Sequence, residues 1–162
     1  MMLVVKSLLE LQQLRRSFSG GLSSFGLLVL LLRFLRDFPP KESREGTECL
    51  GSALLGFLDL FGRQFEPAAH GVTILGVGGG GFVERSHPSL FVFRTDSVFI
   101  QDPINPTNNL GYNCYRLHEI QRLMAEALVV IERQGSAPPQ SKASSHGWHL
   151  LHHIIGPILQ GL

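Results

Sequence analysis

The sequence has little charge and little cysteine. Only 17% of its 162 residues are Asp, Glu, Lys or Arg, against about 25% in typical soluble domains, and the net charge is +1. This balance excludes bulk electrostatic attraction to nucleic acid or to a membrane, so any such contact must come from a local patch. The two cysteines, Cys49 and Cys114, lie far apart, which excludes a disulfide framework and a cysteine-type zinc site. We therefore expect a reducing intracellular compartment.

Long hydrophobic runs are also lacking. The most apolar stretch, residues 27–32, ends at Arg33 after six residues, whereas a membrane span needs about 20. This stretch predicts a buried core helix. The segment from Met1 to Lys6 has no basic region ahead of its apolar residues, so it does not predict a signal peptide. The length and the 44% hydrophobic content predict about one domain with a sizeable core.

Hydrophobic periodicity predicts a mostly helical α+β fold with a small antiparallel sheet. Helices are expected where apolar residues recur every three or four positions, over residues 3–18, 25–38, 50–65 and 114–133. Ser23 or Ser24 should cap the second helix and Pro39 should end it. The β-branched and aromatic runs 71–74 and 98–100 predict short strands, and a further apolar run lies at 90–93.

Two segments have ambiguous signals. The glycines at 78–81 suggest a phosphate loop, but Phe82-Val83 follows instead of Lys-Ser/Thr and a helix, which favours a flexible hairpin. Residues 134–162 are expected to form a linker and a weakly ordered tail. On a helix, His149 and His153 of this tail would share one face as a metal pair. A surface or disordered tail is the alternative.

Two further segments have the chemistry of a binding site. Small residues at 19–24 allow close backbone approach, a helix N-terminus favours an anion, and Phe25 offers a stacking face. The simpler interpretation is an N-cap followed by a core phenylalanine. Residues 102–109 contain three asparagines and two prolines, which suit either the reading of a base edge or an ordinary turn.

Three segments, in order, resemble one family. Ser-Gly-Gly-Leu-Ser-Ser-Phe at 19–25 is similar to the (T/S)GG(I/L)SSY segment of noncanonical poly(A) polymerases and terminal uridylyltransferases. Residues 50–71 resemble the start of their PAP-associated domain, and residues 100–111 resemble their nucleotide recognition motif. The resemblance covers residues 3–133, and it implies the helical central domain of a polymerase-β-like nucleotidyltransferase.

The resemblance also implies roles for individual residues. Lys6 and Ser24 correspond to groups that contact the nucleotide triphosphate, with Ser23 beside them, and Phe25 replaces the tyrosine that stacks on the base. Asp102 matches the aspartate of the recognition motif, and Asn108 matches the base-reading position, where uridylyltransferases commonly have His. Asn105 stands where many relatives have an acidic residue, and Tyr112 replaces an arginine.

The family's catalytic palm is not recognisable in this sequence. No Gly-Ser followed by Asp-x-Asp occurs, so the three carboxylates that would hold Mg²⁺ or Mn²⁺ are missing, and we expect the chain alone to be inactive.

The implied function is nucleotide recognition in template-independent addition of AMP to RNA 3′ ends, with ATP preferred. The implied partners are ATP, the RNA 3′ end, the missing palm and RNA-binding proteins, in the nucleus or cytoplasm, without a membrane. Alternatives are a noncatalytic interaction or regulatory module from a truncated paralogue and a uridylyltransferase fragment.

Overall fold

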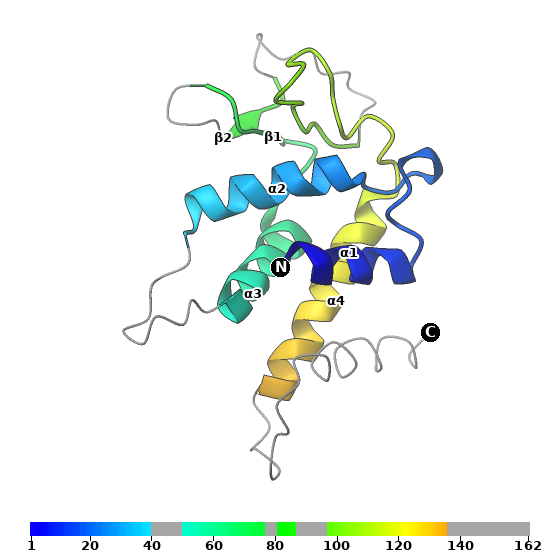
Figure 1. The fold of residues 1–162 in the computed structure, drawn as a ribbon, viewed down its shortest axis with the longest axis vertical. Helices are drawn as coiled ribbons and strands as arrows, with labels where there is room; N and C mark the ends of the chain where they lie inside the picture. Colours follow the sequence, from blue (N-terminus) through cyan, green and yellow to red (C-terminus); the bar gives the residue numbers. More distant parts are fainter. Residues whose placement is uncertain (40–49, 77–80, 87–96, 136–162) are drawn as a thin grey trace.

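The computed structural model describes residues 1–39, 50–76, 81–86 and 97–135. Within these ranges the chain forms a helical body with a hairpin beyond one side of α2 (Figure 1). The elements are α1 (Met2–Leu11), α2 (Ser24–Asp37), α3 (Leu50–Asp59), β1 (His70–Thr73), β2 (Gly81–Glu84) and α4 (Leu117–Gly135). The predicted α+β fold, mostly helical with a small antiparallel sheet, is confirmed.

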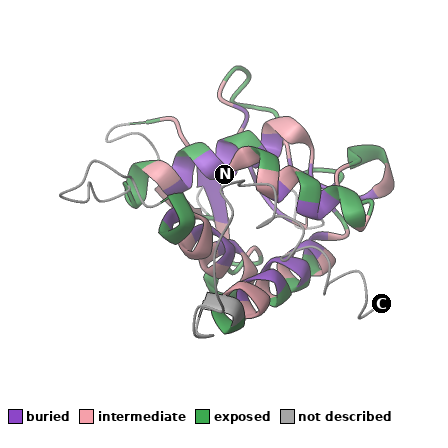
Figure 2. Cartoon of the chain, turned by 60° about the horizontal axis from the view of Figure 1, so that its bottom comes forward, coloured by how far each residue is buried: buried purple, intermediate pink, exposed green. Residues whose placement is uncertain are grey.

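The core lies where the helices face one another. Buried residues occupy the inward faces of the helices, and exposed residues occupy the outer faces (Figure 2). Phe57 of α3 is fully buried and packs edge-on against Phe34 of α2, with ring centroids 5.6 Å apart. Burial of a side chain of this size stabilises the fold by about 1.5–3 kcal/mol, so this aromatic contact fixes α3 against α2.

The first helix is shorter than predicted. It ends at Leu11 rather than at residue 18, because Gln13 has a positive φ of 52° and the Leu14 N–H donates to Leu9 O at 2.8 Å. This turn buries Leu14. A short 3₁₀ turn follows at Ser17–Ser19, and Gly20 ends that turn rather than the helix.

The other predicted helices are found with small shifts. Ser23 caps α2 as expected, since its Oγ accepts a hydrogen bond from Gly26 N at 3.0 Å. The helix predicted over 50–65 is α3, which continues as a π-helical turn at Leu60–Gln64. Helix α4 begins at Leu117 instead of 114, because the backbone first forms a turn in which Cys114 N donates to Gly111 O.

The sheet contains only one of the two predicted strands. Strand β1 is confirmed, but its antiparallel partner is β2, at the end of the glycine tract, where no strand was predicted. The predicted strand 98–100 forms only a parallel bridge between Ile100 and Val72. The apolar run 90–93, the glycines at 78–80, Cys49 and the histidine-containing tail lie outside the described residues.

Candidate functional site

Asp102 organises the loop that follows the bridge at Ile100. Its side chain is only 8% exposed, and its carboxylate accepts three hydrogen bonds. Asn108 Nδ2 donates to Oδ2 at 2.9 Å. The backbone N–H groups of Ile104 and Asn105 donate to Oδ1 at 2.8 and 3.2 Å. These bonds close residues 102–108 into one compact loop.

The charge of Asp102 fixes the orientation of Asn108. The side-chain hydrogen bond from Asn108, followed by the backbone N–H groups of Ile104 and Asn105, lowers the pKa of the Asp102 carboxyl, so it is ionised at neutral pH. An ionised carboxylate can only accept hydrogen bonds. The amide NH₂ of Asn108 must therefore face Asp102, and its carbonyl oxygen Oδ1 points elsewhere. Asn108 is an exposed residue.

Asn105 supports the same loop from within. Its backbone carbonyl accepts from Asn108 N at 2.8 Å, and its side-chain Oδ1 accepts from Thr107 Oγ1 at 2.8 Å. Asn105 is exposed. The structure thus brings together three of the predicted residues, Asp102, Asn105 and Asn108.

Asn109 has a structural role that the sequence analysis missed. Its Oδ1 accepts from Ile100 N at 2.9 Å and from Gly111 N at 2.8 Å, while its Nδ2 donates to Val98 O at 3.0 Å. The side chain therefore closes the base of the loop and holds it against the segment that borders β1. In the sequence, only its position beside Asn108 singles it out.

The start of α2 presents the second group of predicted residues. The hydroxyl of Ser23 caps the helix. Ser24 is the first helical residue and does not act as the cap. Ser24 and Phe25 are half-buried, and Phe25 packs against the core. Neither is enclosed. The hydroxyl of Ser24 and the first N–H groups of α2 are thus placed at a helix end that favours an anion.

Two glycines make this approach to α2 possible. A Cβ on Gly21 would lie 2.2 Å from Leu14 O, so only glycine lets the two backbones approach this closely. Gly20 has a φ of +82°, which a side chain rarely adopts. Its carbonyl accepts from Arg116 N at 3.0 Å. This bond connects the turn before α2 to the chain that leaves the 102–109 loop.

Lys6 comes from a different element. It lies on α1 with its side chain half-buried, whereas the other predicted residues lie at the start of α2 and in the 102–109 loop. The predicted site residues therefore lie on three parts of the fold: α1, the N-terminus of α2, and the Asp102 loop.

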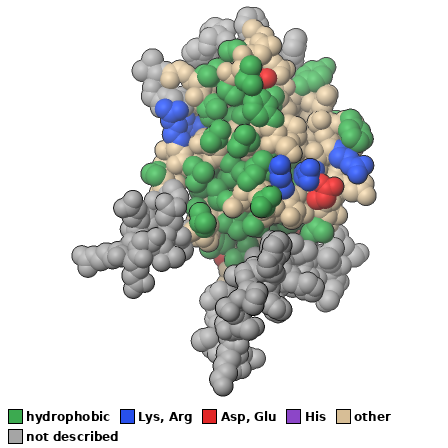
Figure 3. Space-filling view, in the orientation of Figure 1, with side chains coloured by type: hydrophobic (Ala, Val, Ile, Leu, Met, Phe, Trp, Pro, Cys, Tyr) green, Lys and Arg blue, Asp and Glu red, His purple; other side chains and the backbone are tan. Residues whose placement is uncertain are grey.

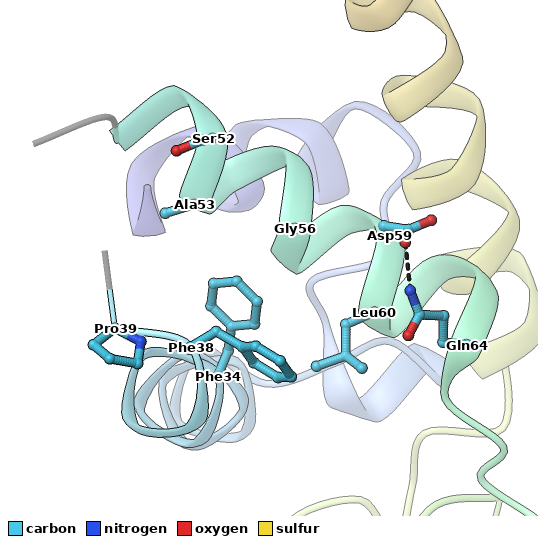
Figure 4. A pocket seen from close by; sticks show the side chains of 9 residues that line it. All are labelled: Phe34, Phe38, Pro39, Ser52, Ala53, Gly56, Asp59, Leu60 and Gln64. Carbon is cyan, nitrogen blue, oxygen red and sulfur yellow. Dashed lines mark hydrogen bonds between the residues drawn. The ribbon is translucent and has the colours of Figure 1, made fainter. Parts of the chain in front are cut away.

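A hollow of about 350 Å³ lies away from all of these residues, between the end of α2 and α3 (Figure 4). Phe34 and Phe38 form its apolar wall, and on its polar side Gln64 Nε2 donates to Asp59 Oδ2. None of the predicted site residues lines it.

The described residues do not fit a catalytic metal centre. Among them, no group of three or more His, Cys, Asp and Glu side chains could hold an ion. Asp102 uses both carboxylate oxygens to accept N–H groups. In the same ranges, no helix is long and apolar enough to cross a membrane.

The comparisons with known proteins agree on one family. Residues 49–108 match the model of the Cid1 family poly A polymerase. The inactive non-canonical poly(A) RNA polymerase protein Trf4-2 of Drosophila melanogaster is 29% identical over all of this chain, which spans 38% of the fly protein. Poly(A) RNA polymerase protein 1 of Saccharomyces cerevisiae is 27% identical over 81% of the chain, which spans 21% of the yeast protein. The chain thus spans about two fifths or less of the length of these relatives.

Solved structures show the same fold. The polymerase core of TRAMP, an RNA surveillance complex, has a TM-score of 0.71 and 24% identity over 84% of this chain and 44% of its own. A mutant of the Cid1 poly(U) polymerase, with asparagine in place of a histidine and bound to MgATP, has a TM-score of 0.66 and 20% identity. That match covers 93% of this chain and 53% of its own.

Proposed function

We propose that this chain, a relative of the noncanonical poly(A) polymerases, supplies the nucleotide-recognition wall of a template-independent RNA nucleotidyltransferase that prefers ATP. In this proposal residues 3–133 form the central and PAP-associated region, and residues 134–162 form a separate tail. Lys6 and Ser24 contact the triphosphate, Phe25 stacks on the base, and Asn108 reads the base edge. The enzyme would act on RNA 3′ ends in the nucleus or cytoplasm, with RNA-binding proteins as partners.

The orientation of Asn108 is the observation that supports this function best. Asp102 accepts one N–H of the Asn108 amide, and in the proposed site the carbonyl oxygen of that amide faces the base. An outward acceptor attracts the exocyclic amine of adenine and repels the carbonyl oxygen that uracil has at the equivalent position. A histidine held by the same carboxylate would instead direct an N–H outward when protonated, and that donor suits uracil. This difference predicts a preference for ATP.

In the proposed site, Phe25 and Asn108 make different contributions to nucleotide binding. Stacking of a base on an aromatic ring contributes about 1–3 kcal/mol and depends little on the base. Phe25 therefore contributes affinity, and selectivity is left to Asn108. A histidine-to-asparagine mutant of the Cid1 poly(U) polymerase, which has the same fold, was crystallised with MgATP, so this fold can hold ATP.

The exposed apolar surface of α1 and α2 supports the proposal that a catalytic domain packs against these helices. Leu3 of α1 is 78% exposed, and Leu28 and Leu32 of α2 are 39% and 46% exposed. Hydrophobic side chains gather over the face that carries these two helices (Figure 3). Contiguous apolar surface of this kind marks an interaction site. We assign it to the catalytic palm, which would also bring the carboxylates for Mg²⁺ or Mn²⁺.

One observation favours a second candidate. The Drosophila relative that matches the whole chain is named as inactive, which supports a noncatalytic interaction or regulatory module. A module of this kind has no need to bind a nucleotide. Binding of ATP by the chain therefore separates the two functions, and preferential binding of UTP would instead indicate a uridylyltransferase.

A titration of the isotope-labelled chain with ATP and with UTP, followed by NMR, tests the proposal. We expect ATP to shift the side-chain NH₂ resonances of Asn108 and the backbone resonances of Ser24 and Phe25 at lower concentration than UTP. Asn108→His should reverse the order of the two nucleotides. Asn113→His is the matched control, because Asn113 is also exposed but lies outside the loop. Equal binding of both nucleotides by the parent chain would contradict base reading by Asn108.

A further inference from the structure

Tyr115 lies directly over the Gly20 turn. A Cβ built on Gly20 would lie 2.3 Å from Cε2 of Tyr115 and 2.5 Å from its Cζ, so the tyrosine ring occupies the space that a side chain at position 20 would need. The next residue, Arg116, donates its N–H to Gly20 O at 3.0 Å. The ring and the backbone together hold the turn, although Gly20 and Tyr115 are far apart in the chain.

This contact connects the two parts of the proposed site. On one side, Gly20 leads within three residues to the cap Ser23 and then to Ser24 and Phe25. On the other side, the segment before Tyr115 is fixed to the Asp102 loop, since Asn109 O accepts from Tyr112 N at 3.2 Å. The segment that carries Tyr115 therefore runs from the loop that carries Asn108 to the turn before α2.

The chain that follows Tyr115 is also fixed in place. Arg116 forms a two-point ion pair with Glu119, with Nε–Oε1 at 2.8 Å and Nη2–Oε2 at 2.6 Å, and its carbonyl accepts from Ile120 N. Arg116 directly precedes α4 and is held by hydrogen bonds from the first turn of that helix. A ring anchored to α4 can hold the Gly20 turn in place, because α4 is packed into the core through Ile120, Leu123 and Met124.

We propose that Tyr115 is a positioning residue for nucleotide binding, which sets the place of Ser24 and Phe25 relative to Asn108 through its contact with Gly20. The inference rests on the proposed function of the same site. Tyr115 is 62% exposed, so its burial contributes little to stability, and the contact with Gly20 is its distinctive feature. Tyr112 has the same exposure of 62% and lies three residues away, which makes it a matched control.

The test uses the full chain and compares Tyr115→Ala, Tyr115→Phe and Tyr112→Ala by titration with ATP and with UTP. Tyr115→Ala should weaken the binding of both nucleotides by the same factor, about tenfold, since it misplaces the stacking and triphosphate groups and leaves Asn108 oriented. Tyr115→Phe should restore binding, because the phenyl ring alone covers Gly20. Tyr112→Ala should bind as the parent does.

A second readout needs no nucleotide. Tyr115→Ala should accelerate hydrogen exchange of the Arg116 amide, which donates to Gly20 O, because the turn at Gly20 loses its contact with the ring, whereas Tyr112→Ala should not. Parent-like nucleotide binding in Tyr115→Ala, or an equal loss in Tyr112→Ala, would overturn the inference. If the parent chain binds neither ATP nor UTP, the proposed function is wrong. Independently of that result, an unchanged exchange rate of the Arg116 amide in Tyr115→Ala would show that the ring does not hold the Gly20 turn in place.

Discussion

Ser23 and Ser24 are adjacent and chemically identical, but the structure gives them different duties. The Oγ of Ser23 accepts from Gly26 N and so caps α2, whereas Ser24 is the first residue inside the helix. We expect Ser23→Ala to lower stability and Ser24→Ala to lower nucleotide affinity. Each variant is the control for the other.

The two effects have different magnitudes. Loss of a serine N-cap costs about 0.5–2 kcal/mol, which lowers the Tm of a domain of this size by about 2–4 °C per kcal/mol. Ser24→Ala should leave the Tm unchanged or slightly higher, because alanine is the better helix former. A hydrogen bond to a charged phosphate oxygen contributes about 1.5–3 kcal/mol, so Ser24→Ala should raise the Kd for ATP roughly tenfold to a hundredfold.

Thermal unfolding and ATP titration of both variants measure these effects. Ser23→Asp, which keeps a capping oxygen, should recover most of the lost stability. If Ser24→Ala lowers the Tm as much as Ser23→Ala and leaves the Kd for ATP unchanged, the assignment of Ser24 to the triphosphate is wrong.

Three other predictions follow from the described residues. The pKa of Asp102 is lowered in the fold, so its stabilisation should be complete above its unfolded pKa of about 3.9 and be lost as the pH falls through the folded value; in urea unfolding against pH, Asp102→Asn should lack this acid-dependent loss. Burial raises the pKa of the Cys114 thiol to about 12, so at about pH 8 peptide mapping should find Cys114 unmodified by iodoacetamide in the native chain and modified in guanidinium. The purified chain should not extend an oligoadenylate primer with ATP and Mg²⁺ or Mn²⁺, because the described residues offer no cluster of three metal-binding side chains; tail growth that depends on residues of this chain would contradict this.

The helices could be predicted where local chemistry marks their ends. Ser23 and Pro39 delimit α2 closely, because a cap and a proline act within a few residues. The end of α1 could not be predicted, since it depends on a positive φ at Gln13, and neither glycine nor proline occurs at residues 11–16. Strand β2 was missed because it begins at the last glycine of the tract and its conformation depends on pairing with β1.

The candidate site was predictable as residue types and not as geometry. The motif at 102–109 gave Asp102 and Asn108, but the hydrogen bond that orients the Asn108 amide comes from the folded loop. Asn109 binds Val98, which lies outside the motif, and the contact of Tyr115 with Gly20 joins two residues that are far apart in the chain. Tertiary contacts of this kind leave no local pattern in a single sequence.

The central claim is that Asn108, held by Asp102, selects adenine. The most direct measurement joins the chain behind the catalytic part of a related polymerase and compares incorporation of ATP with that of UTP for the parent, Asn108→His and the control Asn113→His. We predict a parent that favours ATP, a ratio that moves toward UTP in Asn108→His, and no change in Asn113→His. An unchanged ratio in an active Asn108→His enzyme would contradict the claim.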